Sequence, residues 1–399
     1  MTTPADLAPL AVAIHRLRLR DLVDLFVERV AMASWTVRRG EVVEHAVVLR
    51  EGAAVRRDGH LVSADGLDRP VLASLLDIPA RALPATPWPA FVPPPAQETF
   101  LPLVGGAGLT VRWWWTWASV FRDGAVTEIR RPQLIEVETA DGQRRLSTWP
   151  ASDGAILAPS PAPHNAPRPG RVTTLLAPAA ATVFVHELLG HPLESDALLA
   201  GGSPWAGSFG EQLLPLPLDL DDDPTRDDLP GGFSADDEGV PAAPRALLRG
   251  GELVGVLSDR AGGAAFGAGG GNARRASCHL PPRPRMSNLI LSAPDGAPLP
   301  PRSAARLEVV RFAAGTLEPR FGLLLLAVRE AWELRRGERH RPVGGFTLVA
   351  DARAARDGLL AAGGVGEASA EPGWCGKDGD VVPTGGSAPW LLVDGLEIR

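Results

Sequence analysis

The sequence has little of what marks secreted, membrane-spanning or nucleic-acid-binding proteins. It has two cysteines in 399 residues, Cys278 and Cys375, too few for a disulfide framework, so a reducing compartment is expected. Its most apolar runs, 173–185 and 323–328, are far shorter than the roughly 20 apolar residues of a membrane helix. No secretory signal pattern is visible at the N-terminus. We therefore expect a cytoplasmic protein with no membrane partner.

An excess of basic charge is also absent. The formal net charge is -7, and arginines are interspersed with Asp and Glu. A nucleic-acid-binding domain normally carries a basic stripe, so no nucleic-acid partner is expected. Tyrosine is missing altogether while tryptophan occurs 11 times, an imbalance for which we have no physical account.

Glycine and proline, by contrast, are abundant, with 44 and 39 residues, which predicts many turns and short strands. Apolar spacing predicts a helix over 6–33, and alternating runs within 34–63 predict a small antiparallel sheet. A second helix is predicted at 68–76. Seven prolines in 77–99 then predict a stiff linker.

These patterns predict an α+β protein of two domains. Residues 1–95 are expected to form an N-terminal helix and antiparallel-sheet domain. Residues 96–399 are expected to form a larger, strand-rich C-terminal domain. A strand at 172–176 and a helix beginning at Pro178 lead into the segment with the most informative chemistry.

That segment contains His186, Glu187 and His191 at the end of an apolar helix. Neutral imidazoles bind zinc, and a neighbouring carboxylate accepts a proton from zinc-bound water. Residues five apart lie about 140° apart around a regular helix, so the two rings would not face one ion. A π-type bulge would bring them together, and Gly190 and Pro192 weaken the helix at this point. We therefore predict a distorted turn between the histidines.

Spacing alone leaves two interpretations open, a metal site or two unrelated histidines at a helix end. A catalytic zinc site also needs a third protein ligand, which the local sequence does not identify. Three residues are candidates on residue type, namely His279, Cys278 and Cys375.

Several ordered segments make the chain resemble the TldD/PmbA family of zinc metallopeptidases. The helix segment 185–196 (VHELLGHPLESD) is similar to the family signature. The acidic, arginine-rich, Pro-Arg-Met and cysteine-containing segments follow in the family's order, at 235–241, 271–281, 284–288 and 373–379. The resemblance is good from Arg171 to the end and loose over the first 170 residues.

This resemblance implies a zinc-dependent peptidase that hydrolyses peptide bonds in small or unfolded peptides. It implies zinc ligation by His186, His191 and Cys375, with Glu187 activating a zinc-bound water. It further implies a subunit of the metal-holding TldD type. Such a subunit would form a homodimer, or a heterodimer with a PmbA (TldE)-type subunit.

Other residues are candidates for supporting roles. His279 is a candidate donor to the tetrahedral oxyanion, and Glu194 and Asp196 are candidates for orienting the ligand histidines. Three arginines are candidates for holding a peptide carboxylate or backbone, namely Arg274, Arg275 and Arg285. The alternative function is a non-catalytic peptide-binding or scaffolding subunit of a TldD/PmbA-type complex. The presence of Glu187 argues against it, because a structural zinc site needs no base.

Overall fold

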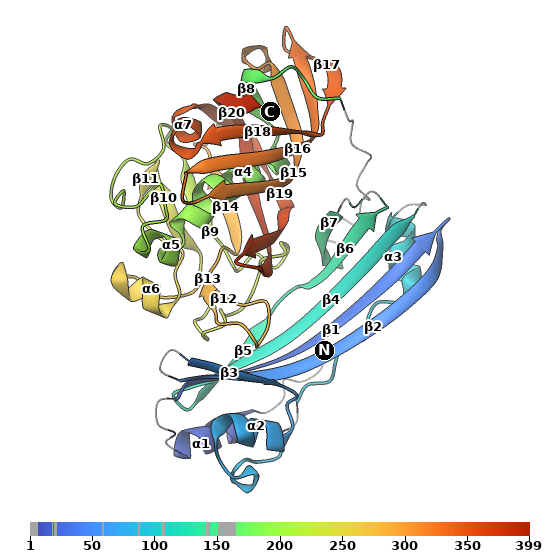
Figure 1. Cartoon of the computed structure of the whole chain (residues 1–399), viewed down its shortest axis with the longest axis vertical. Helices are drawn as coiled ribbons and strands as arrows, with labels where there is room; N and C mark the ends of the chain where they lie inside the picture. The colour runs from blue at the N-terminus through green and yellow to red at the C-terminus, as the bar shows by residue number, and fades with distance from the viewer. Residues whose placement is uncertain are drawn as a thin grey trace.

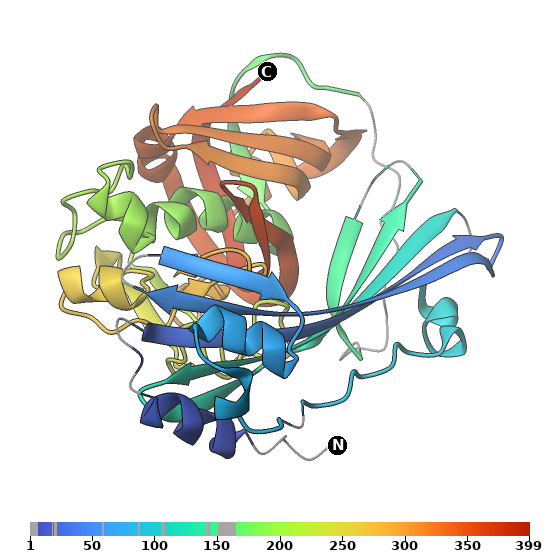
Figure 2. The ribbon, with the colours of Figure 1, turned by 60° about the horizontal axis from the view of Figure 1, so that its bottom comes forward.

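The computed structural model describes residues 7–17, 19, 22–57, 60–86, 88–104, 108–140, 142, 144–150 and 165–399. These residues form an α+β structure rich in strands, as the sequence predicts. A long curved sheet from the N-terminal part lies beside a thicker C-terminal body (Figure 1). The view in Figure 2 shows the blue N-terminal strands passing in front of that body.

The N-terminal sheet is antiparallel, in the order β3-β2-β1-β4-β6-β7, with β5 also paired to β4. Its strands are β1 (Leu22–Arg38), β2 (Glu41–Arg57), β3 (His60–Asp65), β4 (Leu109–Arg122), β5 (Ala125–Arg130), β6 (Gln133–Thr139) and β7 (Arg144–Trp149). The β1-β2 hairpin turns through Arg39 and Gly40, both with positive φ, as the favoured two-residue hairpin turn requires.

The predicted helix over 6–33 is wrong for most of its length. The helix α1 covers Ala8–Arg16 only, and β1 begins at Leu22; residues 6, 18, 20 and 21 lie outside the described residues. Residues 24–28 of β1 are all buried, because both faces of the strand are covered there. A strand buried on both faces loses its alternating pattern, so its apolar spacing was misread as a helical face. The second predicted helix is confirmed as α2 (Arg69–Leu76).

The proline-rich segment 77–99 packs against the N-terminal sheet instead of linking two domains. It contains the short helix η1 (Ala80–Ala82). The Trp88 indole donates a hydrogen bond of 2.9 Å to the carbonyl of Leu67, and Phe91 makes an edge contact with a tryptophan of β4. The segment leads into α3 (Gln97–Val104), whose Phe100 is fully buried.

The strands therefore do not divide between the two sheets at the expected domain boundary, between residues 95 and 96. Strands β4 to β7 follow that position in the sequence but complete the sheet that β1 begins. The change from one sheet to the other lies between Trp149 and Gly170. The prolines fix extended backbone on the sheet surface, and composition alone does not distinguish this from a linker.

The C-terminal sheet has the order β11-β10-β9-β14-β20-β18-β16-β15-β8, and β8 pairs again with β20, so five of its strands form a closed ring. Its strands are β8 (Gly170–Leu176), β9 (Asp219–Asp222), β10 (Arg245–Arg249), β11 (Glu252–Leu253), β14 (Asn288–Ser292), β15 (Leu307–Glu318), β16 (Leu323–Arg335), β17 (Glu338–Val343), β18 (Phe346–Asp351), β19 (Leu359–Lys377) and β20 (Asp380–Ile398). β12 (Ala273–Arg274) and β13 (Arg283–Pro284) pair separately.

The helix α4 (Pro178–Val185) lies in the centre of this body, against β15, β19 and β20 (Figure 1). All of its residues except Ala179 are buried, as expected for a helix that is apolar all round. The remaining helices are short: α5 (Ser195–Leu199), α6 (Arg260–Ala265), η4 (Arg302–Ala304) and α7 (Ala352–Asp357). None of the helices in the described ranges is long and apolar enough to cross a membrane.

The long hairpin of β19 and β20 carries Cys375 to the end of α4. Its turn residues Asp378 and Gly379 have φ of 51° and 82°, which again suits a two-residue hairpin turn. Cys375 pairs with Val382 in the register of this hairpin. A residue near the C-terminus is thereby placed beside a helix that begins at Pro178.

The packing of Phe100 gives a test of whether α3 belongs with the N-terminal sheet. Phe100 is fully buried, and its ring lies 4.7 Å from that of Trp35 in β1. We expect Phe100→Ala to lower the free energy of unfolding by about 3–5 kcal/mol, because it leaves a cavity. Urea unfolding followed by tryptophan fluorescence measures the change. Phe321→Ala, at a 70% exposed position, is the matched control and should change stability by less than about 0.5 kcal/mol. Equal effects of the two substitutions would contradict this packing.

Candidate metal centre

The backbone at the end of α4 is irregular where the sequence predicts a distorted turn. α4 continues into a π-helical turn over His186–Gly190 and then a 3-10 turn over His191–Leu193. A Cβ atom at Gly190 would lie 2.0 Å from Met286 Sδ, so glycine is required for the turn to pack here. The predicted bulge is confirmed, and it brings both histidines to one side.

Three donor atoms meet at this turn. One ligand atom each from His186, His191 and Cys375 lies within 4.8 Å of the other two. Cys375 Sγ is 3.4 Å from His191 Nε2, and the two imidazole rings are perpendicular with centroids 4.9 Å apart. His186 and Cys375 are buried, while His191 is partly exposed.

This donor set fits zinc. Two imidazole nitrogens and a thiolate leave one position open, as in catalytic zinc sites. Zinc bonds of about 2.3 Å to sulfur and 2.0–2.1 Å to nitrogen, at a tetrahedral angle, place the two ligand atoms about 3.5 Å apart. The observed separation of Cys375 Sγ and His191 Nε2, 3.4 Å, agrees with that value.

Charged side chains hold the thiol and the imidazole in place. Arg285 is buried and donates hydrogen bonds to the Sγ atom, at 3.0 Å, and to the carbonyl of Cys375. Burial alone would raise the pKa of the Cys375 thiol, but its attraction to His191 and His186 holds that pKa well below its usual value. These charges thus favour the thiolate, which is the form that a metal requires.

Glu194 orients His191 from the opposite side. Its Oε1 lies 3.3 Å from His191 Nδ1, leaving Nε2 to face the thiol. Burial would raise the pKa of Glu194, but His191, Lys377 and Arg285 lower it below its usual value, so the carboxylate stays charged. Such a carboxylate fixes the tautomer and direction of a ligand imidazole.

Lys377 is a residue that the sequence analysis missed. Its ammonium donates at 2.7 Å to Glu194 and at 2.7 Å to both carboxylate oxygens of Asp196. It is the only lysine in the chain, although Lys and Arg together number 40. A compact ammonium with three donors suits three converging oxygens, and this isolated lysine two residues after Cys375 was a signal in the sequence.

Glu187 lies beside the cluster in a cavity of about 460 Å³. Its Oε2 accepts a hydrogen bond of 3.2 Å from the backbone N–H of Leu317 in β15. A Cβ atom at Gly315 would lie 2.5 Å from Glu187 Cγ, so this glycine makes room for the carboxylate. All three cluster residues and Glu187 line the same cavity, as do residues 312–317 of β15.

The other residues singled out from the sequence lie elsewhere. His279 is outside this cavity and contacts Ser63 and Asp65 of β3 at 3.0 and 3.1 Å. Arg285, expected to bind substrate, is buried behind Cys375. Cys278 is buried between the sheets, where its N–H donates to Glu28.

Arg274 and Arg275 line a different and larger cavity between the two sheets. Of the residues that the sequence analysis selected for supporting roles, Glu194 is the one placed against a ligand histidine. Asp196 instead accepts a hydrogen bond from Lys377.

Residues 169–399 match the family model described as the PmbA/TldA metallopeptidase C-terminal domain. The chain belongs to the TldD/PmbA family. The match covers more than half of the chain and contains His186, Glu187, His191 and Cys375.

Relatives in the TldD/PmbA family are named as metalloproteases. A TldD homolog from Haemophilus influenzae is 29% identical over 219 residues, 54% of this chain and 45% of that protein. A metalloprotease from Methanothermobacter thermautotrophicus is 31% identical over 249 residues, 60% of this chain and 51% of that protein. The chain thus spans about half the length of the curated relatives it matches.

The fold also matches solved structures. The crystal structure of TldE from Thermococcus kodakarensis superimposes with a TM-score of 0.69, covering 97% of this chain and 100% of that chain at 14% identity. At that identity the match shows a shared fold, which extends over the N-terminal sheet as well as the metallopeptidase domain.

Lys377 provides a test of the charges that surround the metal centre. Lys377→Met removes the cation that pairs with Glu194 and Asp196, so the carboxylate that orients His191 is less well held. We expect zinc affinity to fall about 10- to 100-fold without unfolding. Competition with a chromophoric zinc chelator measures this. Lys377→Arg keeps the charge and should lose less, whereas unchanged zinc affinity in Lys377→Met would show that the ammonium has no part in holding the site.

Proposed function

We propose that this chain is a zinc-dependent peptidase that holds its metal with His186, His191 and Cys375 and uses Glu187 as the catalytic base. The observation that supports it best is the convergence of two imidazoles and a thiol within 4.8 Å, next to a buried carboxylate on the same turn. A structural zinc would need no base here and would be enclosed by a fourth protein ligand. The three donors instead line an open cavity.

Zinc bound here would supply a Lewis acid that makes water more acidic and polarises a peptide carbonyl. Glu187 would accept the proton of the attacking water and return it to the leaving amine. The N–H of Leu317 holds the Oε2 atom of Glu187, which fixes the direction of the base. Arg285 stabilises the thiolate of Cys375, and Glu194 aims the imidazole of His191, as ligation requires.

The substrate proposed for this site is an extended chain, supplied by small or unfolded peptides. Within residues 165–399, β8 pairs with β15 only as far as Val309, because the chain turns at Pro178 into α4. The edge of β15 beyond Val309 faces the cavity, through residues 312–317. A peptide added to this edge as a further strand would pass Glu187 and the metal ligands.

The proposal extends to partner and location. The chain keeps the full donor set, so we infer a subunit of the TldD type, in a homodimer or with a PmbA (TldE)-type subunit. The protein from Haemophilus influenzae that it resembles is a TldD homolog by name. Both cysteines are free, as is usual for proteins of a reducing compartment, so the location we propose is the cytoplasm.

Zinc content and peptide cleavage test the proposal together. We expect about one zinc per wild-type chain by mass spectrometry, retained in Glu187→Gln and lost in Cys375→Ala. Cleavage of an unstructured peptide should fall at least about 100-fold in Glu187→Gln, because general base catalysis contributes about 10²–10⁴-fold.

Cys278→Ala is the matched control, since Cys278 is also buried but lies away from the donor cluster. It should retain both zinc and cleavage. Zinc without cleavage in the wild type, alone or mixed with a PmbA-type subunit, would favour the non-catalytic, peptide-binding or scaffolding role. Zinc retained in Cys375→Ala would mean that the third ligand lies elsewhere.

A further inference from the structure

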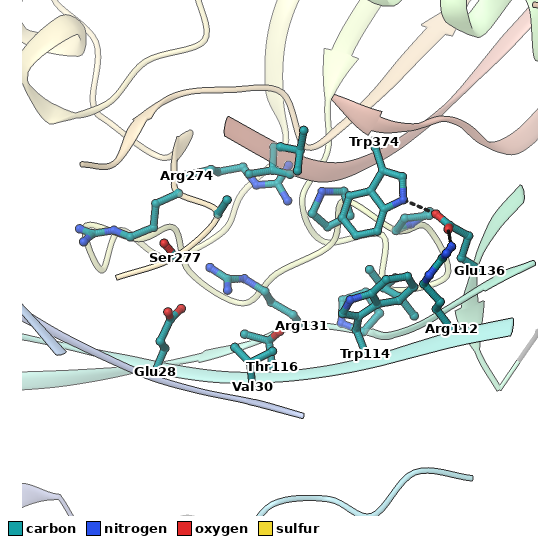
Figure 3. A pocket seen from close by; sticks show the side chains of 18 of the residues that line it. Glu28, Val30, Arg112, Trp114, Thr116, Arg131, Glu136, Arg274, Ser277 and Trp374 are labelled. Atoms are coloured by element: carbon teal, nitrogen blue, oxygen red, sulfur yellow. Dashed lines mark hydrogen bonds and ion pairs between the residues drawn. The ribbon is translucent and has the colours of Figure 1, made fainter. Parts of the chain in front are cut away.

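A second cavity, of about 710 Å³, lies between the two sheets (Figure 3). Its floor comes from β1, β2, β4 and β6 of the N-terminal sheet. Its roof comes from residues 274–277 and from the β19-β20 hairpin, with Trp374 above Trp114 in the view of Figure 3. Both structural units thus contribute to it.

The lining of this cavity is strongly basic. Its charged residues are Arg50, Arg112, Arg131, Arg144, Arg274 and Arg275, against Glu28 and Glu136. Burial raises the pKa of Glu28, which favours its neutral form. The charge in the cavity is therefore positive, in a chain whose net charge is -7.

Only some of these arginines have a carboxylate partner. Arg112 pairs with Glu136 and Glu138, Arg131 with Asp237, and Arg144 with Glu138. Within the described part of the chain, the other three have no ion pair within 4.0 Å, namely Arg50, Arg274 and Arg275.

Two of these three guanidinium groups are buried. All three nitrogens of the Arg275 guanidinium lack a hydrogen-bond acceptor, although only 4% of the residue is exposed. Arg274 donates one hydrogen bond, to the carbonyl of Met286. Burial, reinforced by the positive charge of Arg131, lowers the pKa of Arg274 to about 10. Buried cations with no carboxylate at ion-pair distance are costly, so an anionic ligand bound in this cavity would stabilise them.

The cavity borders the candidate metal centre at Trp374. This residue precedes Cys375 and lines both cavities. A smaller cavity of about 200 Å³ shares Trp374 with both, Glu136 and Arg144 with the basic cavity, and Glu371 and Pro372 with the metal cavity. The Trp374 indole is fixed by a 2.6 Å hydrogen bond to Glu136 and an edge contact with Trp114. An extended peptide at the metal would thus have the basic cavity next along its path.

We propose that this arginine-lined cavity is a substrate subsite that binds carboxylates of the peptide, from acidic side chains or from a free C-terminus. The inference rests on the proposed peptidase function, because it takes the ligand to be the chain being cleaved. Arg50, Arg274 and Arg275 supply the unpaired charges, and Arg112 and Arg131 add to the positive field. The subsite makes the enzyme selective for acidic peptides.

Fluorescence anisotropy with the full chain carrying Glu187→Gln tests binding without cleavage. The probes are a labelled ten-residue peptide with four glutamates, amidated at its C-terminus, and the same peptide with four glutamines, amidated or as the free acid. At low salt we expect the glutamate peptide to bind at least about tenfold more tightly than the amidated glutamine peptide, since hydrogen bonds between charged groups are about twice as strong as neutral ones. Tighter binding of the free acid than of the amidated glutamine peptide would assign the subsite to the C-terminus.

Arg275→Gln should lower the preference for the carboxylate peptide about tenfold. Arg50→Gln should lower the same preference about threefold. Because Arg50 is exposed, this variant should fold. Arg335→Gln, at an exposed position of β16 outside the cavity lining, should bind like the parent. Equal binding of all three peptides, or a preference that survives in both Arg50→Gln and a folded Arg275→Gln, would overturn the subsite.

Cleavage separates this result from the proposed function. If zinc-loaded wild type cleaves the glutamine peptide but shows no preference for carboxylates, the subsite is wrong and the peptidase stands. If carboxylate binding depends on these arginines but wild type cleaves none of the three peptides, the subsite stands and the peptidase is wrong.

Discussion

The candidate site depends on one contact between distant parts of the chain, that of Cys375 Sγ with His191 Nε2 at 3.4 Å, across 184 positions of sequence. Two features of the fold impose it. The buried helix α4 cannot shift because it is enclosed by the strands that surround it. The β19-β20 hairpin has a fixed register, set by its two-residue turn. Each donor is therefore held by main-chain structure before any metal binds, which favours tight ligation.

Charges alternate around this contact. The thiol faces the guanidinium of Arg285, and His191 faces the carboxylate of Glu194, which in turn pairs with Lys377. These contacts favour the charged forms of Glu194 and of the Cys375 thiol despite their burial. The basic cavity beyond Trp374 lacks this balance, because no carboxylate of the described residues lies within 4.0 Å of the guanidinium groups of Arg274 and Arg275. In the proposed subsite, a bound carboxylate of the substrate would supply that balance.

Sequence reasoning was most successful where the informative residues are neighbours. His186, Glu187 and His191 are within six positions, and their spacing together with Gly190 predicted the π-helical turn. Physical reasoning could not choose among Cys375, Cys278 and His279, because Cys375 is placed beside the histidines by hairpin register, which the sequence does not reveal. Only the family resemblance selected Cys375. The positions of Arg285 behind the thiol and of Lys377 beside Glu194 also depend on tertiary structure, although the isolated lysine was visible in the sequence.

The N-terminal half was predicted less well for a related reason. A helix was wrongly predicted over 6–33 because β1 is buried on both faces. The proline-rich segment was wrongly predicted to be a linker because its packing on the sheet depends on tryptophans elsewhere in the chain. Both errors come from tertiary burial, which overrides the local pattern.

X-ray absorption at the zinc edge of the metal-loaded protein tests the central claim most directly. The account predicts one sulfur at about 2.3 Å and nitrogen or oxygen ligands at about 2.0–2.1 Å, including two imidazoles. A first shell without sulfur would contradict it, since Cys375 would then not be a ligand. A shell with two sulfurs would also contradict it, because Cys278 lies between the sheets and is not part of the donor cluster.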